Sequence, residues 1–178
     1  MKIAVVALGG NALVKKGQKI SIASQQKIIN KALDCILDLL HEKYKIIITH
    51  GNGVQVGNIL IRVEEALGKA YTLPLEVCVA ESEGEMGYLI EQTLQNKLTQ
   101  HHKKHPVVSL LTQVIVDKND PLFHRPTKPI GPWYTKTQAQ KIQRQGLHMA
   151  EIEPGKYRRV VPSPRPIKID DVAIIKDL

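Results

Sequence analysis

The stretch KIIITHGNGVQVGNILIRVEEAL (Lys45–Leu67) sets out the organisation of the whole chain. Its first residues, KIIIT, form a short apolar run that predicts a strand, and a glycine-rich loop follows. Beyond the loop, apolar residues recur every three or four positions and predict a helix, at Val56, Ile59, Leu60, Val63 and Leu67. The glycines are spaced Gly-x-Gly-x-x-x-Gly, one residue longer than the dinucleotide-binding fingerprint, so they argue only weakly for a Rossmann site.

The same strand-then-helix order is found on both sides of this stretch. IAVVAL (Ile3–Leu8) predicts a strand buried on both faces, and residues 24–44 predict one amphipathic helix. A further helix is expected over about Glu81–Leu98, and one or two strands within VVSLLTQVIV (Val107–Val116). Strands that alternate with helices predict an α/β fold, with a parallel or mostly parallel sheet and helices on its faces.

After Asp117 the composition changes, because eight prolines follow, at positions 121, 126, 129, 132, 154, 162, 164 and 166. Only a short helical stretch, near Thr137–Gln145, lies between them. Proline fixes the backbone and removes a hydrogen-bond donor. The segment from about 118 to 160 is therefore predicted to be a stiff lid attached to the sheet, not an independent second domain.

Length and composition limit the class of protein. The chain has 178 residues, 43% of them hydrophobic, which is enough for one globular domain with a core. No early segment has the pattern of a secretion signal, and no apolar run approaches the roughly 20 residues that span a bilayer. We therefore expect a soluble, cytoplasmic chain without a membrane partner.

Cysteine and histidine give no sign of a metal site. Cys35 and Cys78 lack a Cys-x-x-Cys spacing, which excludes a zinc motif, and both are expected to pack as small apolar residues. The histidines of HHKKH (His101–His105) are expected in a solvated turn. His50 has no evident acid or base partner, so a structural hydrogen bond is expected for it. No metal ligand is predicted.

The formal net charge of +8 suits either a nucleic acid or small anions such as phosphates. A single Trp and a single Phe provide no platform on which bases could stack, and the chain contains no nucleic-acid motif. The charge therefore favours small anions, and no nucleic-acid partner is expected.

Two glycine loops follow the first two predicted strands: LGGNA (Leu8–Ala12) and HGNGVQVG (His50–Gly57). In an open parallel sheet, ligands bind beyond the carboxyl ends of the strands, where helix N-termini present free N–H groups. Glycine permits positive φ and close backbone approach, and asparagine adds a side-chain donor. Each loop alone could be a simple turn. The same Gly-Asn chemistry twice at one edge favours an anion pocket.

A third element is PTKPIGPWY (Pro126–Tyr134), where Lys128 stands in a loop that prolines make rigid. Most lysines are solvated surface charges, and that alternative stays open for Lys128. A lysine held in place loses little entropy when it meets a phosphate, which suits phosphoryl transfer.

Six segments together resemble the carbamate kinases of the amino acid kinase superfamily. They are LGGNA, THGNGxQVG, PLEVC (Pro74–Cys78), TQVIVDKNDPLF (Thr112–Phe123), PTKPIGPWY and RRVVPSPRP (Arg158–Pro166). They follow the family's order along nearly the whole chain, and the proline-rich ones are specific to carbamate kinases.

The resemblance implies a three-layer αβα sandwich, a homodimer, and reversible phosphate transfer between ATP and carbamate, run toward ATP in arginine fermentation. It implies that Gly9, Gly10 and Asn11 form a phosphate-facing loop and that Gly51, Asn52 and Gly53 hold carbamoyl phosphate or carbamate. It also implies that Lys128 is the catalytic residue that reaches the transferred phosphoryl group. Mg²⁺ would enter with ATP or ADP, and no protein ligand for it is predicted.

Three residues depart from the family pattern. Val54 stands where proline is usual, which loosens the loop slightly. Glu83 and Glu85 stand where Gln and an apolar residue are expected. Their charge would either weaken packing and repel phosphate or sit harmlessly at an exposed helix start.

The sequence ends at DDVAIIKDL (Asp170–Leu178). In the family this helix leads into a second half with the nucleotide pocket, so residues 1–178 are expected to form the carbamoyl phosphate side, without the nucleotide site. A sheet edge and apolar helix faces would then be uncovered. Two hypotheses follow: an enzyme that acts as part of a longer or split protein, or a truncated, inactive remnant that serves as a binding or dimerisation module. No ATP formation is expected from the isolated chain.

Overall fold

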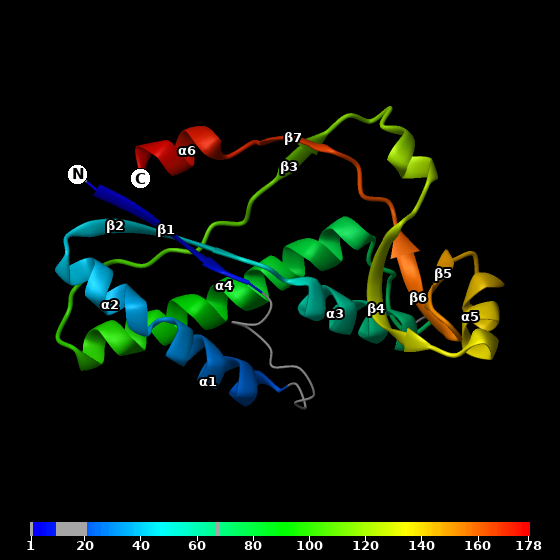
Figure 1. Ribbon diagram of the computed structural model, residues 1–178, viewed down its shortest axis with the longest axis horizontal. Helices are drawn as coiled ribbons and strands as arrows, with labels where there is room; N and C mark the ends of the chain where they lie inside the picture. Colours follow the sequence, from blue (N-terminus) through cyan, green and yellow to red (C-terminus); the bar gives the residue numbers. More distant parts are fainter. Residues whose placement is uncertain (1, 10–20, 67) are drawn as a thin grey trace. The chain divides into compact units, whose positions relative to one another are not determined.

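The computed structural model describes residues 2–9, 21–66 and 68–178 (Figure 1). These residues divide into two compact units. The first unit comprises Met1–Gly53 and Val79–Leu110. The second unit comprises Val54–Cys78 and Leu111–Leu178. Each unit is thus built from two separate segments of the chain.

The sheet of the first unit confirms the two strands predicted around the glycine loops. β1 (Lys2–Leu8) and β2 (Tyr44–His50) pair in parallel, from Lys2 opposite Tyr44 to Leu8 opposite His50. One face of the pair packs on the core, whereas Ile3 and Val5 on the other face are 58% and 66% exposed. The prediction that β1 is buried on both faces is therefore wrong, because the described helices cover only one face.

Three helices supply the rest of this core: α1 (Ile22–Ala32), α2 (Asp34–His41) and α4 (Leu75–Gln100). Where one helix was predicted over residues 24–44, the chain forms α1 and α2, separated at Leu33. Leu33 is fully buried, and its N–H still bonds to the carbonyl of Ile29 at 2.9 Å. The buried cluster consists of Leu8, Ile29, Leu33, Ile36, Met86, Leu89, Ile90, Leu94 and Leu98.

Helix α4 begins at Leu75, earlier than the predicted start near Glu81. Glu83 and Glu85 are half-buried residues in the interior of this helix. The alternative that they occupy an exposed helix start is therefore wrong. The helix dipole favours negative charge in the first turn, and both carboxylates lie beyond that turn.

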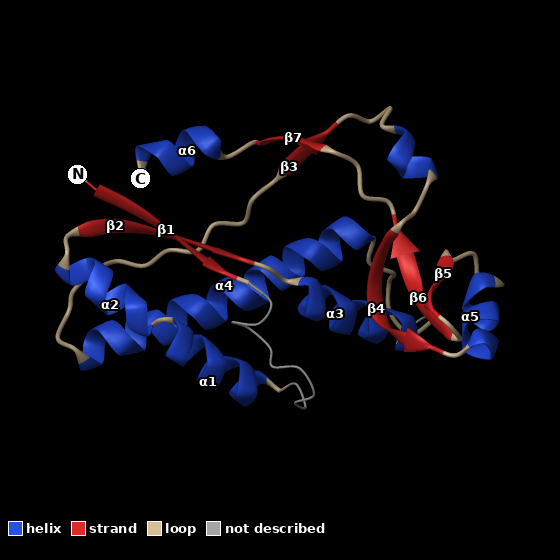
Figure 2. Cartoon of the chain, viewed as in Figure 1, coloured by secondary structure: helices blue, strands red, loops and turns tan. Residues whose placement is uncertain are grey.

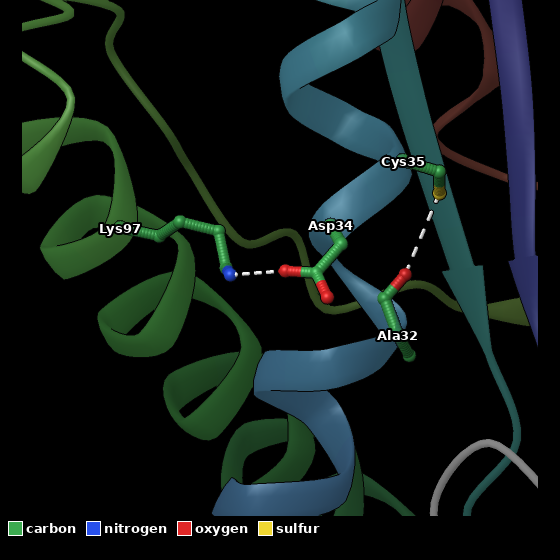
Figure 3. Close-up of polar contacts among 4 residues, drawn as sticks. All are labelled: Ala32, Asp34, Cys35 and Lys97. Atoms are coloured by element: carbon green, nitrogen blue, oxygen red, sulfur yellow. Dashed lines mark hydrogen bonds and ion pairs between the residues drawn. The ribbon is translucent and has the colours of Figure 1, made fainter.

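A buried lysine joins α4 to α2 (Figure 3). The Lys97 side chain is 9% exposed, and its Nζ lies 2.5 Å from Oδ1 of Asp34. Figure 3 also shows Cys35, whose Sγ lies 3.4 Å from the carbonyl oxygen of Ala32. Cys35 is exposed, so its predicted packing is wrong, whereas the prediction for Cys78 is confirmed because that side chain is fully buried.

The second unit contains the antiparallel strands, coloured red with β1 and β2 in Figure 2. β4, β6 and β5 form a three-stranded sheet in that order, and β3 pairs with β7. The bounds are β3 (Val114–Val116), β4 (Lys128–Tyr134), β5 (Met149–Glu153), β6 (Lys156–Val161) and β7 (Pro166–Ile169). The helices are α3 (Gly53–Glu65), which belongs to this unit from Val54 onward, a 3-10 helix (Pro121–His124), α5 (Lys136–Gln143) and α6 (Val172–Asp177).

The short helix predicted near Thr137–Gln145 is α5, and one strand, β3, forms within Val107–Val116. The predicted lid, residues 118–160, lies in this unit and is built mainly from β4, α5, β5 and β6. Its action as a lid stays a prediction.

Helix α3 docks on the pair of strands β4 and β6. A Cβ added to Gly57 would lie 3.2 Å from the Cα of Gly131, so helix and strand touch backbone to backbone. Glu64 lies seven residues after Gly57 in α3, and its Oε1 accepts a hydrogen bond from Nη1 of Arg159 at 3.1 Å. A spacing of seven places both contacts on one helix face. The third glycine of the motif therefore serves packing inside the second unit.

Candidate functional site

The two glycine loops meet at one edge of the β1–β2 sheet. Leu8 and His50, the last residues of the two strands, lie opposite each other. The N–H of Gly51 then donates to the carbonyl of Leu8 at 3.2 Å. The predicted proximity of the two loops is confirmed as far as Gly9, whereas Gly10 and Asn11 lie outside the described residues.

Glycine can be required at a position because the backbone has positive φ or because a side chain would clash with a neighbour. A Cβ added at Gly9, Gly51 or Gly53 would meet no described heavy atom within 4 Å, and none of the three has positive φ. Of the two properties of glycine considered for these loops, positive φ is therefore not used at these three positions. Neither backbone conformation nor packing of the described residues requires glycine there. Glycine at these positions would allow a bound molecule to approach the backbone closely.

The second loop leads directly into the N-terminus of α3, which begins at Gly53. The first turn of a helix presents backbone N–H groups that bind anions. Val54 lies in this first turn, where proline is also well accepted, so the exchange between the two keeps the helix start.

The side chain of Asn52 is held by helix α4. Its Nδ2 donates to Oγ of Ser82 at 2.8 Å, and that hydroxyl donates to the carbonyl of Val79 at 2.6 Å. Ser82 is fully buried, and Asn52 is half-buried. Sequence reasoning found Asn52 but missed Ser82. The available signal was the spacing of four between Cys78, Ser82 and Met86, which places a serine on the buried face of α4.

Lys128 is the first residue of β4 and is exposed, with its Cα opposite Val161. The prediction of a rigid loop is wrong for this segment, because Lys128–Tyr134 is a strand. β4 is an edge strand, where Pro129 and Pro132 are tolerated because their missing N–H groups need no ladder partner. Within the described ranges, no residue forms a hydrogen bond or ion pair with the Lys128 ammonium group. Lys128 belongs to the second unit, whereas Gly9 and Gly51–Gly53 belong to the first.

The remaining candidates have structural surroundings. His50 Nδ1 lies 3.2 Å from the carbonyl oxygen of Gly51, which fits the expected structural hydrogen bond. Among the described residues, no group of three or more His, Cys, Asp or Glu side chains could hold a metal. None of the described helices is both long and apolar enough to cross a membrane.

A hollow of about 530 Å³ in the second unit is lined by Asp117, Asn119, Asp120, Pro121, Arg165, Pro166 and Ile167. The carboxylate of Asp120 accepts the N–H groups of Arg165 and Leu122, both at 2.8 Å. These two bonds lower the pKa of Asp120. Its carboxylate therefore joins the segments around Pro121 and Arg165.

The sequence is similar to that of known proteins along nearly its whole length. Residues 2–176 match the amino acid kinase family. The carbamate kinase of Pyrococcus furiosus is 40% identical over 99% of this chain and 57% of its own length. The carbamate kinase-like protein YahI of Escherichia coli is 42% identical, with the same coverage.

Solved structures agree. Carbamate kinase from Giardia lamblia bound to AMP-PNP superimposes with a TM-score of 0.86 at 36% identity, covering 99% of this chain and 56% of that one. The same enzyme bound to citric acid gives a TM-score of 0.88, with 57% of that chain covered. This chain thus spans a little over half the length of the relatives it matches. The family match and these α/β neighbours show that the chain belongs to the amino acid kinase family and has the fold of that family's carbamate kinases.

Proposed function

We propose that this chain provides the carbamoyl phosphate side of a carbamate kinase-type phosphotransfer, ATP plus carbamate to and from ADP plus carbamoyl phosphate. The observation that carries the proposal is the meeting of the two glycine loops, where Gly51 bonds to Leu8 and space is open around Gly9, Gly51 and Gly53. Membership of the amino acid kinase family and similarity to carbamate kinases support the choice of substrate.

The chemistry suits these groups. Carbamate is already an anion, so the transfer needs no strong base, and it depends instead on donors and cations around the transferred phosphoryl group. Backbone N–H groups of Gly9–Asn11 and Gly51–Gly53 would supply donors, and Lys128 would supply the cation. ATP or ADP with Mg²⁺ would be the co-substrate, as the AMP-PNP complex of the Giardia lamblia relative supports. The proposal includes a homodimer in the cytoplasm that works toward ATP in arginine fermentation.

A second candidate is binding of carbamoyl phosphate without transfer. The observation in its favour is the coverage, since this chain matches only 57% of the length of its relatives. Under this alternative the loops keep their ligand, while the transfer needs further polypeptide.

Titration of the ¹⁵N-labelled chain with carbamoyl phosphate tests the site. We expect amide shifts at Gly9 and Gly51–Gly53 and none at Gly84, a helical glycine of α4 outside the loops. Gly51→Ala should stay folded, because its Cβ meets no described atom. It should nevertheless weaken binding by about tenfold, since the methyl group blocks close approach to the backbone. Unshifted loop amides would overturn the proposed function.

An assay for ATP formation from carbamoyl phosphate, ADP and Mg²⁺ tests whether the 178 residues carry out the transfer by themselves. Turnover that disappears in Lys128→Ala would support phosphotransfer by this chain. Loop shifts without turnover, the result we expect for the 178 residues alone, would indicate that these residues hold carbamoyl phosphate while the transfer needs further polypeptide.

A further inference from the structure

We propose that Ser82 is a positioning residue which turns Asn52 into an acceptor for the amino group of carbamoyl phosphate. The pair would make the site select carbamoyl phosphate over acyl phosphates that lack this amino group. The inference rests on the proposed function and adds a specificity-determining residue to it.

The orientation of the Asn52 amide follows from the single proton of the Ser82 hydroxyl. That proton is donated to the carbonyl of Val79 at 2.6 Å. Ser82 Oγ then accepts, and the group that donates to it at 2.8 Å is the NH₂ group of Asn52. An amide turned by 180° would place Oδ1 against Oγ, and the buried hydroxyl would have to give up its bond to the Val79 carbonyl in order to donate to that oxygen. The hydrogen-bond network thus defines which end of the amide is oxygen.

This orientation leaves the carbonyl oxygen Oδ1 and one N–H of Asn52 for other partners. Asn52 is half-buried and stands between Gly51 and Gly53, around which space is open. The backbone N–H groups of such a loop and helix start are donors, which suit phosphate oxygens. These N–H groups cannot accept a hydrogen bond from an amino group. Within Gly51–Gly53, Oδ1 of Asn52 is the side-chain atom that can accept such a bond.

Carbamoyl phosphate and acetyl phosphate differ in the group on the carbonyl carbon. Carbamoyl phosphate carries an amino group there and acetyl phosphate carries a methyl group, while the phosphate is the same. A site that accepts a hydrogen bond from a ligand N–H rejects the analogue without it, because a desolvated acceptor is then left unpaired. For one neutral hydrogen bond on a half-exposed side chain, we expect about a tenfold preference for carbamoyl phosphate.

The experiment compares dissociation constants for carbamoyl phosphate and acetyl phosphate, measured from loop amide shifts of the 178-residue chain. Ser82→Ala removes the hydroxyl and frees Asn52 to rotate. We expect the preference to fall from about tenfold to about twofold or less, mainly through weaker carbamoyl phosphate binding. The side-chain NH₂ signals of Asn52 should also move before any ligand is added.

Thr93→Val is the matched control. The Thr93 hydroxyl donates to the carbonyl of Leu89 at 2.6 Å, the same kind of bond within the same helix, with no contact to Asn52. Its removal should leave the preference at about tenfold. If Ser82→Ala does not fold, Ser82→Cys fills the site with a slightly larger side chain of the same shape that is a poorer acceptor, and it should lower the preference in the same way.

The outcomes distinguish the two proposals. Loops that respond to neither ligand would overturn the proposed function. Loops that bind both ligands equally in the native chain would leave the phosphate pocket standing and overturn this inference. An undiminished preference in folded Ser82→Ala or Ser82→Cys would also overturn it.

Discussion

Gly57→Ala should destabilise the second unit, although alanine is the better helix former. The new Cβ would lie 3.2 Å from the Cα and 3.4 Å from the N of Gly131. Gly131 cannot easily yield, because its carbonyl accepts two hydrogen bonds from Arg158, from Nη2 at 2.6 Å and from Nε at 3.2 Å. Its φ of +71° also restricts the conformations open to β4 at this point.

Two opposing effects set the magnitude. Overpacking a close contact costs roughly 1–3 kcal/mol. Replacing glycine by alanine inside a helix contributes about 1 kcal/mol in the opposite direction. The control, Gly84→Ala in α4, gains the helix term alone, because a Cβ there meets no described atom within 4 Å. The two variants should therefore differ by the whole overpacking term, about 2 kcal/mol.

Urea unfolding followed by circular dichroism measures this difference. With a slope of about 2 kcal/mol/M, the midpoint of Gly57→Ala should lie about 1 M below that of Gly84→Ala. Gly57→Ala should cost less when it is made in an Arg158→Leu background than in the native chain, since Gly131 is then free to shift. Equal midpoints for the two glycine variants would refute the assigned contact between α3 and β4.

Two further predictions concern charged groups. Asp120 has a pKa below the ordinary 3.8, because it accepts the N–H groups of Arg165 and Leu122, so its contribution is present above pH 3.8 and is lost as pH falls through the lower folded value. Amide exchange at Leu122 and Arg165 should therefore accelerate at acid pH in the native chain more than in Asp120→Asn, and parallel pH profiles would contradict this. Asp34→Ala should cost about 1 kcal/mol, because it leaves the ammonium group of Lys97 with 9% exposure and no Asp34 partner, while the 66% exposure of Asp34 limits the loss through screening. Lys97→Met removes the charge with its desolvation and should cost less in urea unfolding, so a larger loss for Lys97→Met would argue against this account.

The elements that the sequence predicted well are those whose signal is local. β1, β2 and α5 lie within one or two residues of their predicted positions, because an apolar run or a capped amphipathic turn is contained in the segment itself. The break between α1 and α2 escaped prediction, since Leu33 continues the apolar spacing without interruption. The spacing reports which face is buried and does not report where the helix axis changes.

In the candidate site, too, features that depend on tertiary contacts could not be predicted from the sequence. Gly51, Gly53 and Gly57 look alike in the motif, yet only Gly57 is packed against another backbone, because its neighbour Gly131 comes from a distant part of the sequence. Likewise, the prolines around Lys128 indicated a loop, and the edge position of β4 that admits them depends on pairing with β6. The role of Ser82 depends on a hydrogen bond to Asn52 across the fold. Such contacts are set by tertiary structure.

The interleaving of the two units constrains the order in which the chain can become structured during synthesis. The apolar face of β1 and β2 is closed by Met86 and Leu94 of α4, which leave the ribosome only after residues 54–78 of the other unit. β1 and β2 therefore keep apolar surface exposed until α4 has been synthesised. Such exposure slows folding and favours binding by chaperones. Trimming either terminus cannot isolate one unit. The smallest autonomous fragment of the first unit would have to be an internal deletion in which a short linker replaces residues 54–78.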